Sequence, residues 1–140
     1  MPDLRTYNLF ISHAWRYGGD YDRMESLLDG AALFHWKNYS CPRSNPAVDP
    51  QSVHPRSTLI KELENQIRPT HCTLVLAGIY VSYSDWIQEE IEIAQSMGKP
   101  IIGVKLWGQE RLPRAVVSAA DEIVGWSTSS IVSAVRKWAI

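Results

Sequence analysis

An acidic side chain among apolar neighbours is the first feature of this sequence that could do chemistry. Residues 84–98 have the spacing of a helix, with a serine and an aspartate available as N-terminal caps and Gly98 at the end. At about 100° per residue, Glu90 projects near the middle of the apolar arc of this helix. A carboxylate there must be paired, protonated or used, because burying a lone charge is costly. The arc consists of Trp86, Ile87, Ile91, Ile93, Ala94 and Met97.

A single well-placed carboxylate suits the cleavage of a glycosidic bond to a good leaving group. The transition state resembles an oxocarbenium ion, which an anion stabilises. A cationic nicotinamide leaves without a general acid, so one glutamate that holds the ribose hydroxyls and faces the developing charge suffices. We therefore expect Glu90 to face a pocket. Two structural alternatives remain open from the residues alone: an ion pair with a nearby arginine or lysine, and a different helical phase.

Five alternating strand–helix units must position this glutamate. The strands are expected at residues 7–12, 34–40, 73–79, 100–106 and 122–126, and the helices begin near residues 20, 57, 84, 113 and 127. This alternation predicts an α/β protein with a parallel sheet covered by helices on both faces. At a length of 140 residues, one domain over residues 1–140 with the flavodoxin-like, three-layer fold and strand order 2-1-3-4-5 is favoured.

Tryptophans gather at the edge of the sheet where a ligand is expected. Ligands of open parallel sheets bind at the carboxyl ends of the strands. Trp15, Trp107 and Trp126 stand at strand ends on that edge, and Trp86 opens the helix of Glu90. The cluster suggests a stacking surface for a flat ligand such as a nucleobase or nicotinamide, although large aromatics can also simply cap a small sheet. The proline-rich segment 41–55 is long enough to be a functional loop.

Composition and motifs argue against several classes of protein. The chain is 45% hydrophobic and 21% charged with a net charge of −1, and neither a basic stripe nor a membrane-length apolar run occurs. The two cysteines and the lack of a signal peptide fit a reducing cytoplasm. The four histidines show no metal-ligand spacing; His35 and His71 are interpreted as structural or solvent-facing. Neither a dinucleotide fingerprint nor a phosphate-binding P-loop is present.

Two short motifs resemble the TIR-domain family. The first is Phe10-Ile11-Ser12-His13 after the first strand, and the second runs from Ser84 to Glu90. The family pattern is Ser-x-Trp followed four residues later by the glutamate of its NAD-cleaving members, and counting from Trp86 reaches Glu90. The chain resembles bacterial TIR-like proteins, including the TIR subunit of Thoeris antiphage systems, which it also resembles at residues 107–109 and 122–126. It departs from the family at Ile87, where a cysteine is usual, and in the loop after Ser12.

This resemblance implies an NAD-consuming enzyme with Glu90 as the catalytic carboxylate. Such an enzyme cleaves the nicotinamide–ribose bond of NAD+ as a glycohydrolase or ADP-ribosyl cyclase, and its product signals to a separate effector protein in antiphage defence. NAD+ is then the substrate, with no further cofactor, metal, nucleic acid or membrane partner, and the cytoplasmic chain forms homo-oligomers through TIR–TIR contacts. The substrate-binding residues expected on this basis are Ser12, His13, Trp15, Asp49, Ser84, Trp86 and Trp107. Of these, Ser84 suits the role of a helix cap better than that of a ligand contact, and Trp86 can equally be a packing residue.

Two other functions remain open from the sequence. Glu90 with Ala94 and the Gly98-Lys99-Pro100 run loosely resembles a nucleoside deoxyribosyltransferase, whose chemistry is also N-glycosidic. A non-catalytic TIR module that only assembles with another TIR domain is the second alternative.

Overall fold

Five strands alternate with five helices in the residues that the computed structural model describes, which are 5–12, 19–39, 56–76, 84–105 and 114–140. The alternation predicted from the sequence is therefore confirmed. In chain order the elements are β1 (Thr6–Ser12), α1 (Gly19–Asp29), β2 (His35–Asn38), α2 (Arg56–Ile67), β3 (Cys72–Leu76), α4 (Ser84–Ser96), β4 (Ile101–Val104), α5 (Arg114–Ala119), β5 (Glu122–Val124) and α6 (Thr128–Trp138).

The five strands form one parallel sheet in the order β2-β1-β3-β4-β5. This is the flavodoxin-like α/β fold predicted above. Because all strands run the same way, their last residues define one edge of the sheet, here named the carboxyl edge, and their first residues define the opposite amino edge. The order reverses between β1 and β3, where Ser12 at the end of β1 pairs with Val75.

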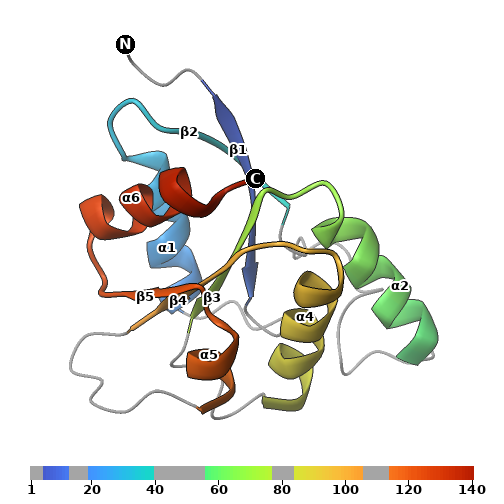
Figure 1. Cartoon of the computed structure of the whole chain (residues 1–140). Coiled ribbons are helices and arrows are strands. Elements are labelled where there is room, and N and C mark those ends of the chain that lie inside the picture. The colour runs from blue at the N-terminus through green and yellow to red at the C-terminus, as the bar shows by residue number, and fades with distance from the viewer. Residues whose placement is uncertain (1–4, 13–18, 40–55, 77–83, 106–113) are drawn as a thin grey trace.

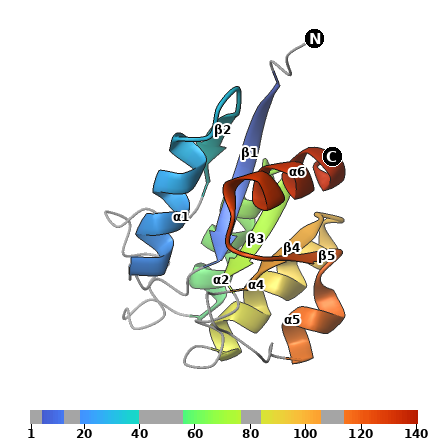
Figure 2. The same cartoon turned by 90° about the vertical axis from the view of Figure 1, so that its left-hand side faces the viewer.

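The helices cover both faces of the sheet (Figures 1 and 2). Helices α1 and α6 pack against one face, and α2, α4 and α5 pack against the other. Each face has its own buried apolar cluster, so β3 between them is buried along its whole length, as is usual for the central strand of a parallel sheet. By contrast, β2 is an outermost strand of the sheet and is largely exposed.

The last strand is shorter than the sequence predicted. It ends at Val124, whereas the expected strand reached Trp126. The reason is the start of α6: the Ser127 hydroxyl accepts a hydrogen bond from the backbone N–H of Ser130, at 3.2 Å, and so caps the helix. The backbone must turn before that cap, and the Ser127 N–H accordingly donates to the Gly125 carbonyl.

None of the helices in the described ranges is both long and apolar enough to cross a bilayer.

Candidate active site at a buried glutamate

Glu90 lies near the middle of α4 and is only 1% exposed. Its neighbours Ile91 and Ala94 are buried as well, whereas Glu92 is exposed and accepts a hydrogen bond from Gln88 at 3.4 Å. The helical spacing in the sequence therefore placed Glu90 on the buried side of this helix correctly. Among the acidic side chains of α4 that the structure describes, Glu90 alone is fully buried, since Glu89 is half-buried and Glu92 is exposed.

Most of the described buried side chains in the layer of Glu90 are apolar. Helix α4 packs between α2 and α5 over the central strands (Figure 1). Glu90 takes part in at least one hydrogen bond or electrostatic contact, as a buried carboxylate must. The buried apolar residues of this face are Phe10, Leu63, Ile67, Val75, Ile91, Ile93, Ala94, Ile101 and Val116. In such surroundings a carboxylate acts on nearby charge far more strongly than it would in water.

The topology brings the helix of Glu90 to the edge where ligands of this fold bind. Helix α4 is the helix between β3 and β4, so its first turns lie at the carboxyl edge. That edge includes the reversal of strand order between β1 and β3, which is the usual ligand site of open parallel sheets. The backbone of Ser12 ends β1 at this same place.

The remaining residues expected to bind substrate are placed only in part. Ser84 and Trp86 lie in the first turn of α4, and Ser12 is the last residue of β1, but the side chains of these residues lie outside the described part of the structure. The expectations for His13, Trp15, Asp49 and Trp107 fall outside the described residues altogether, as does the proline-rich segment. Their contacts with a ligand stay predictions.

One tryptophan of the expected aromatic cluster belongs to another part of the molecule. Trp126 is half-buried and packs against the cluster formed with α1 and α6. Glu90 lies on the opposite face, in the layer of α4. The expectation that Trp126 stacks on a ligand beside Glu90 is therefore not supported, because the turn before Ser127 leads the chain onto the α1–α6 face.

The described histidines fit the structural interpretation made from the sequence. His71 accepts a hydrogen bond at Nδ1 from the backbone N–H of Asn8, at 2.9 Å, and His35 is exposed in β2. Within the described ranges, no group of three or more histidine, cysteine, aspartate or glutamate side chains is arranged to hold a metal ion.

A cavity at the amino edge was not foreseen from the sequence. Lys99, Asp121 and Trp138 line it, and they come from the ends of three elements that are distant along the chain. The spacing of residues within one helix or strand cannot predict that these residues lie close together, since only the topology of the sheet places the ends of these elements side by side.

Comparison with known proteins supports both the family resemblance and the fold. A family model described as the TIR-like domain of the Thoeris protein ThsB matches residues 10–111. The solved structure of the Clostridium botulinum CMP N-glycosidase BcmB is similar in fold, with a TM-score of 0.53 and 13% sequence identity, over 94% of this chain and 98% of that chain. The curated proteins include no match.

Proposed function

This chain belongs to the Thoeris ThsB TIR-like family, and we propose that it cleaves an N-glycosidic bond with Glu90 as its catalytic carboxylate. The proposed substrate is NAD+ and the proposed bond is that between nicotinamide and ribose. The observation that carries the proposal is the burial of Glu90, among mostly apolar side chains, on the helix that starts at the carboxyl edge. Two independent arguments lead to Glu90: its phase in the helix, and its spacing from Trp86 in the family motif.

The chemistry needs little more than one carboxylate. As the C1′–N bond breaks, its electron pair passes to the ring nitrogen and neutralises the nicotinamide, while positive charge develops on the ribose. A fixed carboxylate in low-dielectric surroundings stabilises that charge. An oxygen or nitrogen nucleophile then bonds to C1′ and loses its proton. Water as the nucleophile gives ADP-ribose, and a second group of the substrate gives a cyclic product.

The family supports a signalling role for the product. We propose that a cyclic or conjugated ADP-ribose derivative is sensed by a separate effector protein in antiphage defence, and that the cytoplasmic enzyme assembles through contacts between TIR domains. The protein that resembles this chain in fold is named for cleaving an N-glycosidic bond of CMP, which supports the same class of reaction.

Cleavage of a nucleoside monophosphate is the second candidate function. The fold of the CMP N-glycosidase favours it. A neutral pyrimidine is a poor leaving group, however, and departs readily only when an acid protonates it. The cationic nicotinamide of NAD+ needs no such acid, so a site built around one carboxylate suits NAD+ better.

The proposal is tested by incubating the purified protein with NAD+, and separately with CMP, over a series of protein concentrations. Nicotinamide or cytosine and the partner product are measured by mass spectrometry. We expect nicotinamide release from NAD+, and a loss of at least about 100-fold in Glu90→Gln. The matched control is Glu92→Gln, which removes an exposed carboxylate from the same helix and should keep full activity.

Stability separates a catalytic role from a structural one. Glu90→Gln keeps the shape of the side chain and its capacity for hydrogen bonds, so its melting temperature should stay close to that of the wild type, whereas a large loss would indicate that Glu90 forms a structural ion pair. Activity in Glu90→Gln equal to that of the wild type would refute the assignment of Glu90. Release of cytosine without release of nicotinamide would favour the second candidate.

A further inference from the structure

A cavity of about 420 Å³ opens at the amino edge, at the opposite end of α4 from the ligand-binding edge. Its walls are the ends of α4, α5 and α6 and the starts of β4 and β5. This cavity is independent of the proposed active site, because Glu90 does not line it. The described residues that line it are Gln95, Gly98, Lys99, Pro100, Ile101, Ala119, Asp121, Trp138 and Ile140.

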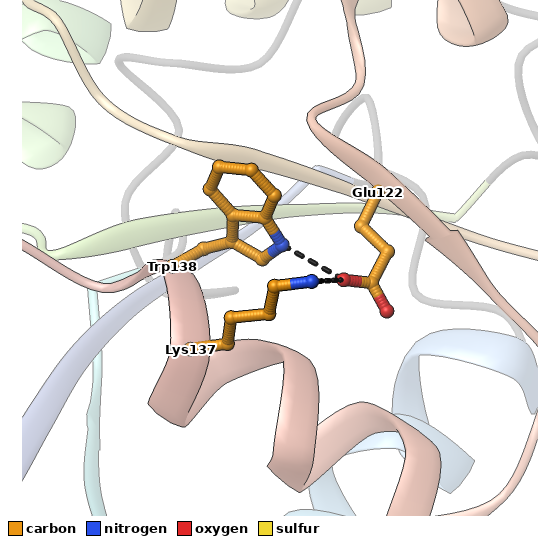
Figure 3. A network of polar contacts seen from close by, with 3 residues as sticks. All are labelled: Glu122, Lys137 and Trp138. Carbon is orange, nitrogen blue, oxygen red and sulfur yellow. Dashed lines mark hydrogen bonds and ion pairs between the residues drawn. The ribbon is translucent and has the colours of Figure 1, made fainter.

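Trp138 gives the cavity a fixed apolar wall. The indole N–H donates a hydrogen bond to Oε1 of Glu122 at 2.8 Å, and Nζ of Lys137 lies 5.2 Å from the ring centre (Figure 3). The same Glu122 oxygen is 3.4 Å from the Lys137 ammonium. Both contacts hold the indole in one orientation, so an apolar ligand would meet a wall that is already ordered.

Two opposite charges line the cavity without pairing with each other. Oδ2 of Asp121 accepts a hydrogen bond from the backbone N–H of Ile101 at 2.9 Å, which fixes the carboxylate. The backbone N–H of Lys99 donates to the Ala94 carbonyl at 2.9 Å and fixes the base of the lysine side chain. Within the described ranges no ion pair joins Lys99 to Asp121. The cavity lining therefore includes one lysine and one aspartate that are not paired with each other.

The remaining electrostatics disfavour a phosphate. Helices α4, α5 and α6 all end at this edge, so their unpaired carbonyls and the negative ends of their dipoles face the region of the cavity. A dianion there would meet one lysine, one aspartate and three helix C-termini, and the neighbouring cation Arg5 lies outside the lining and already donates to the Ile140 carbonyl. A ligand with a single carboxylate can instead form an ion pair with Lys99. A ligand ammonium can form an ion pair with Asp121 and donate hydrogen bonds to the helix carbonyls.

We propose that the amino-edge cavity binds a small zwitterion with an apolar body, of the class of an amino acid or dipeptide with an aromatic or aliphatic side chain. The ligand carboxylate pairs with Lys99, the ammonium pairs with Asp121, and the side chain packs against Trp138. The proposal does not depend on the enzymatic function.

Binding is measured by NMR titration of the full chain with L-phenylalanine and with glycyl-L-phenylalanine, which differ in the spacing of their two charges. The backbone amide signals of Gly98, Ile101 and Asp121 report on the cavity. At least one probe should give saturable shifts at millimolar concentration, on the order of 1 mM for a weak small-molecule complex. Phenethylamine and 3-phenylpropionate, which each lack one charge, should bind about tenfold more weakly. The absence of saturation with both zwitterions would overturn the proposal.

Variants test the two charges separately. Asp121→Asn retains an acceptor for the Ile101 N–H but loses the charge, and Lys99→Gln loses the ammonium. Each substitution should weaken the binding of the zwitterion about tenfold. Asp121→Asn should not weaken the binding of 3-phenylpropionate, which has no ammonium group. The controls Lys105→Gln and Glu62→Gln change charges outside the cavity lining and should bind normally. Equal affinity in Asp121→Asn and the wild type, or tighter binding of inorganic phosphate than of either zwitterion at the amides of Gly98, Ile101 and Asp121, would contradict the assigned ligand class.

Discussion

Among the described residues, three polar side chains are buried, Thr70, Thr73 and Glu90, and the last two differ in how their polar groups are satisfied. Glu90 would carry a charge, and it takes part in a polar interaction. Thr73 of β3 is completely buried, but its hydroxyl oxygen finds no hydrogen-bond partner among the described residues. An unbonded buried hydroxyl costs free energy on folding, because it gives up hydrogen bonds to water without replacement. The free-energy cost of burial therefore comes from a missing hydrogen bond at Thr73 and from the removal of a carboxyl group from water at Glu90.

Replacing the Thr73 hydroxyl by a methyl group should stabilise the protein. We expect Thr73→Val to raise the free energy of unfolding by about 1 kcal/mol, since valine keeps the shape of the side chain and needs no partner. Urea unfolding monitored by tryptophan fluorescence measures the change. The matched variant Thr73→Ser keeps the hydroxyl and removes the methyl group, so it should destabilise the protein. A loss of stability in Thr73→Val would show that the hydroxyl has a partner.

The sequence could single out Glu90 but not Thr73. Glu90 is marked by the period of a single helix, which needs no knowledge of the rest of the fold. The state of Thr73 depends on what β1 and β4 place beside it, where it pairs with Phe10 and Ile101. Those neighbours lie on separate elements, so local spacing contains no information about them.

At the scale of elements, the end of α4 is fixed by one glycine. Gly98 has a φ of +68°, and the N–H of Lys99 donates to the Ala94 carbonyl across the last turn. This is the left-handed C-terminal cap that glycine favours. The sequence predicted this stop from glycine followed by Lys99 and Pro100, and the structure confirms it. Strand ends were predicted less well, because the turns that follow the strands decide them, as at Val124, where the chain turns toward the Ser127 cap of α6.

Gly98→Ala should lower the free energy of unfolding by about 1 kcal/mol. A Cβ at this position would meet no atom within 4 Å, so the cost is purely that of the positive φ. Thermal and urea unfolding measure the loss. Gly125→Ala is the matched control, because a Cβ there also meets nothing within 4 Å and its φ lies outside the left-handed range. Equal effects of the two substitutions would contradict a conformational cause.

At the scale of the whole molecule, the parallel sheet separates two sites along α4. All strands end at the edge where α4 begins, and all start at the edge where it ends. The proposed chemistry therefore belongs to one edge and the amino-edge cavity to the other. Alternating strands and helices allowed the sheet order to be predicted, but the side chains that meet at an edge come from segments as distant as Lys99 and Trp138. Sequence spacing cannot bring these together.

His71 joins three parts of the chain at the amino edge. Its backbone N–H donates to the Asn8 carbonyl at 2.7 Å, and its Nδ1 accepts from the Asn8 N–H at 2.9 Å. Its carbonyl accepts from the N–H of Ile140 at 3.2 Å, and the Ile140 carbonyl accepts in turn from Arg5. Burial lowers the pKa of His71 below its ordinary value of 6.5, and the positive charges of Arg5 and Lys99 lower it further. The neutral ring is thus the form that the fold requires.

The lowered pKa of His71 predicts that stability falls in mild acid. The unfolded chain binds the proton more readily than the folded one, so the contribution of His71 is complete above pH 6.5 and is lost as the pH falls below it. His71→Asn offers an amide oxygen to the Asn8 N–H but does not titrate. Urea unfolding between about pH 7.5 and about pH 5.5 should therefore show a smaller loss in His71→Asn than in the wild type. High salt should reduce the difference by screening Arg5 and Lys99, but burial should preserve part of it. Identical pH profiles for the two proteins would rule out a shifted histidine.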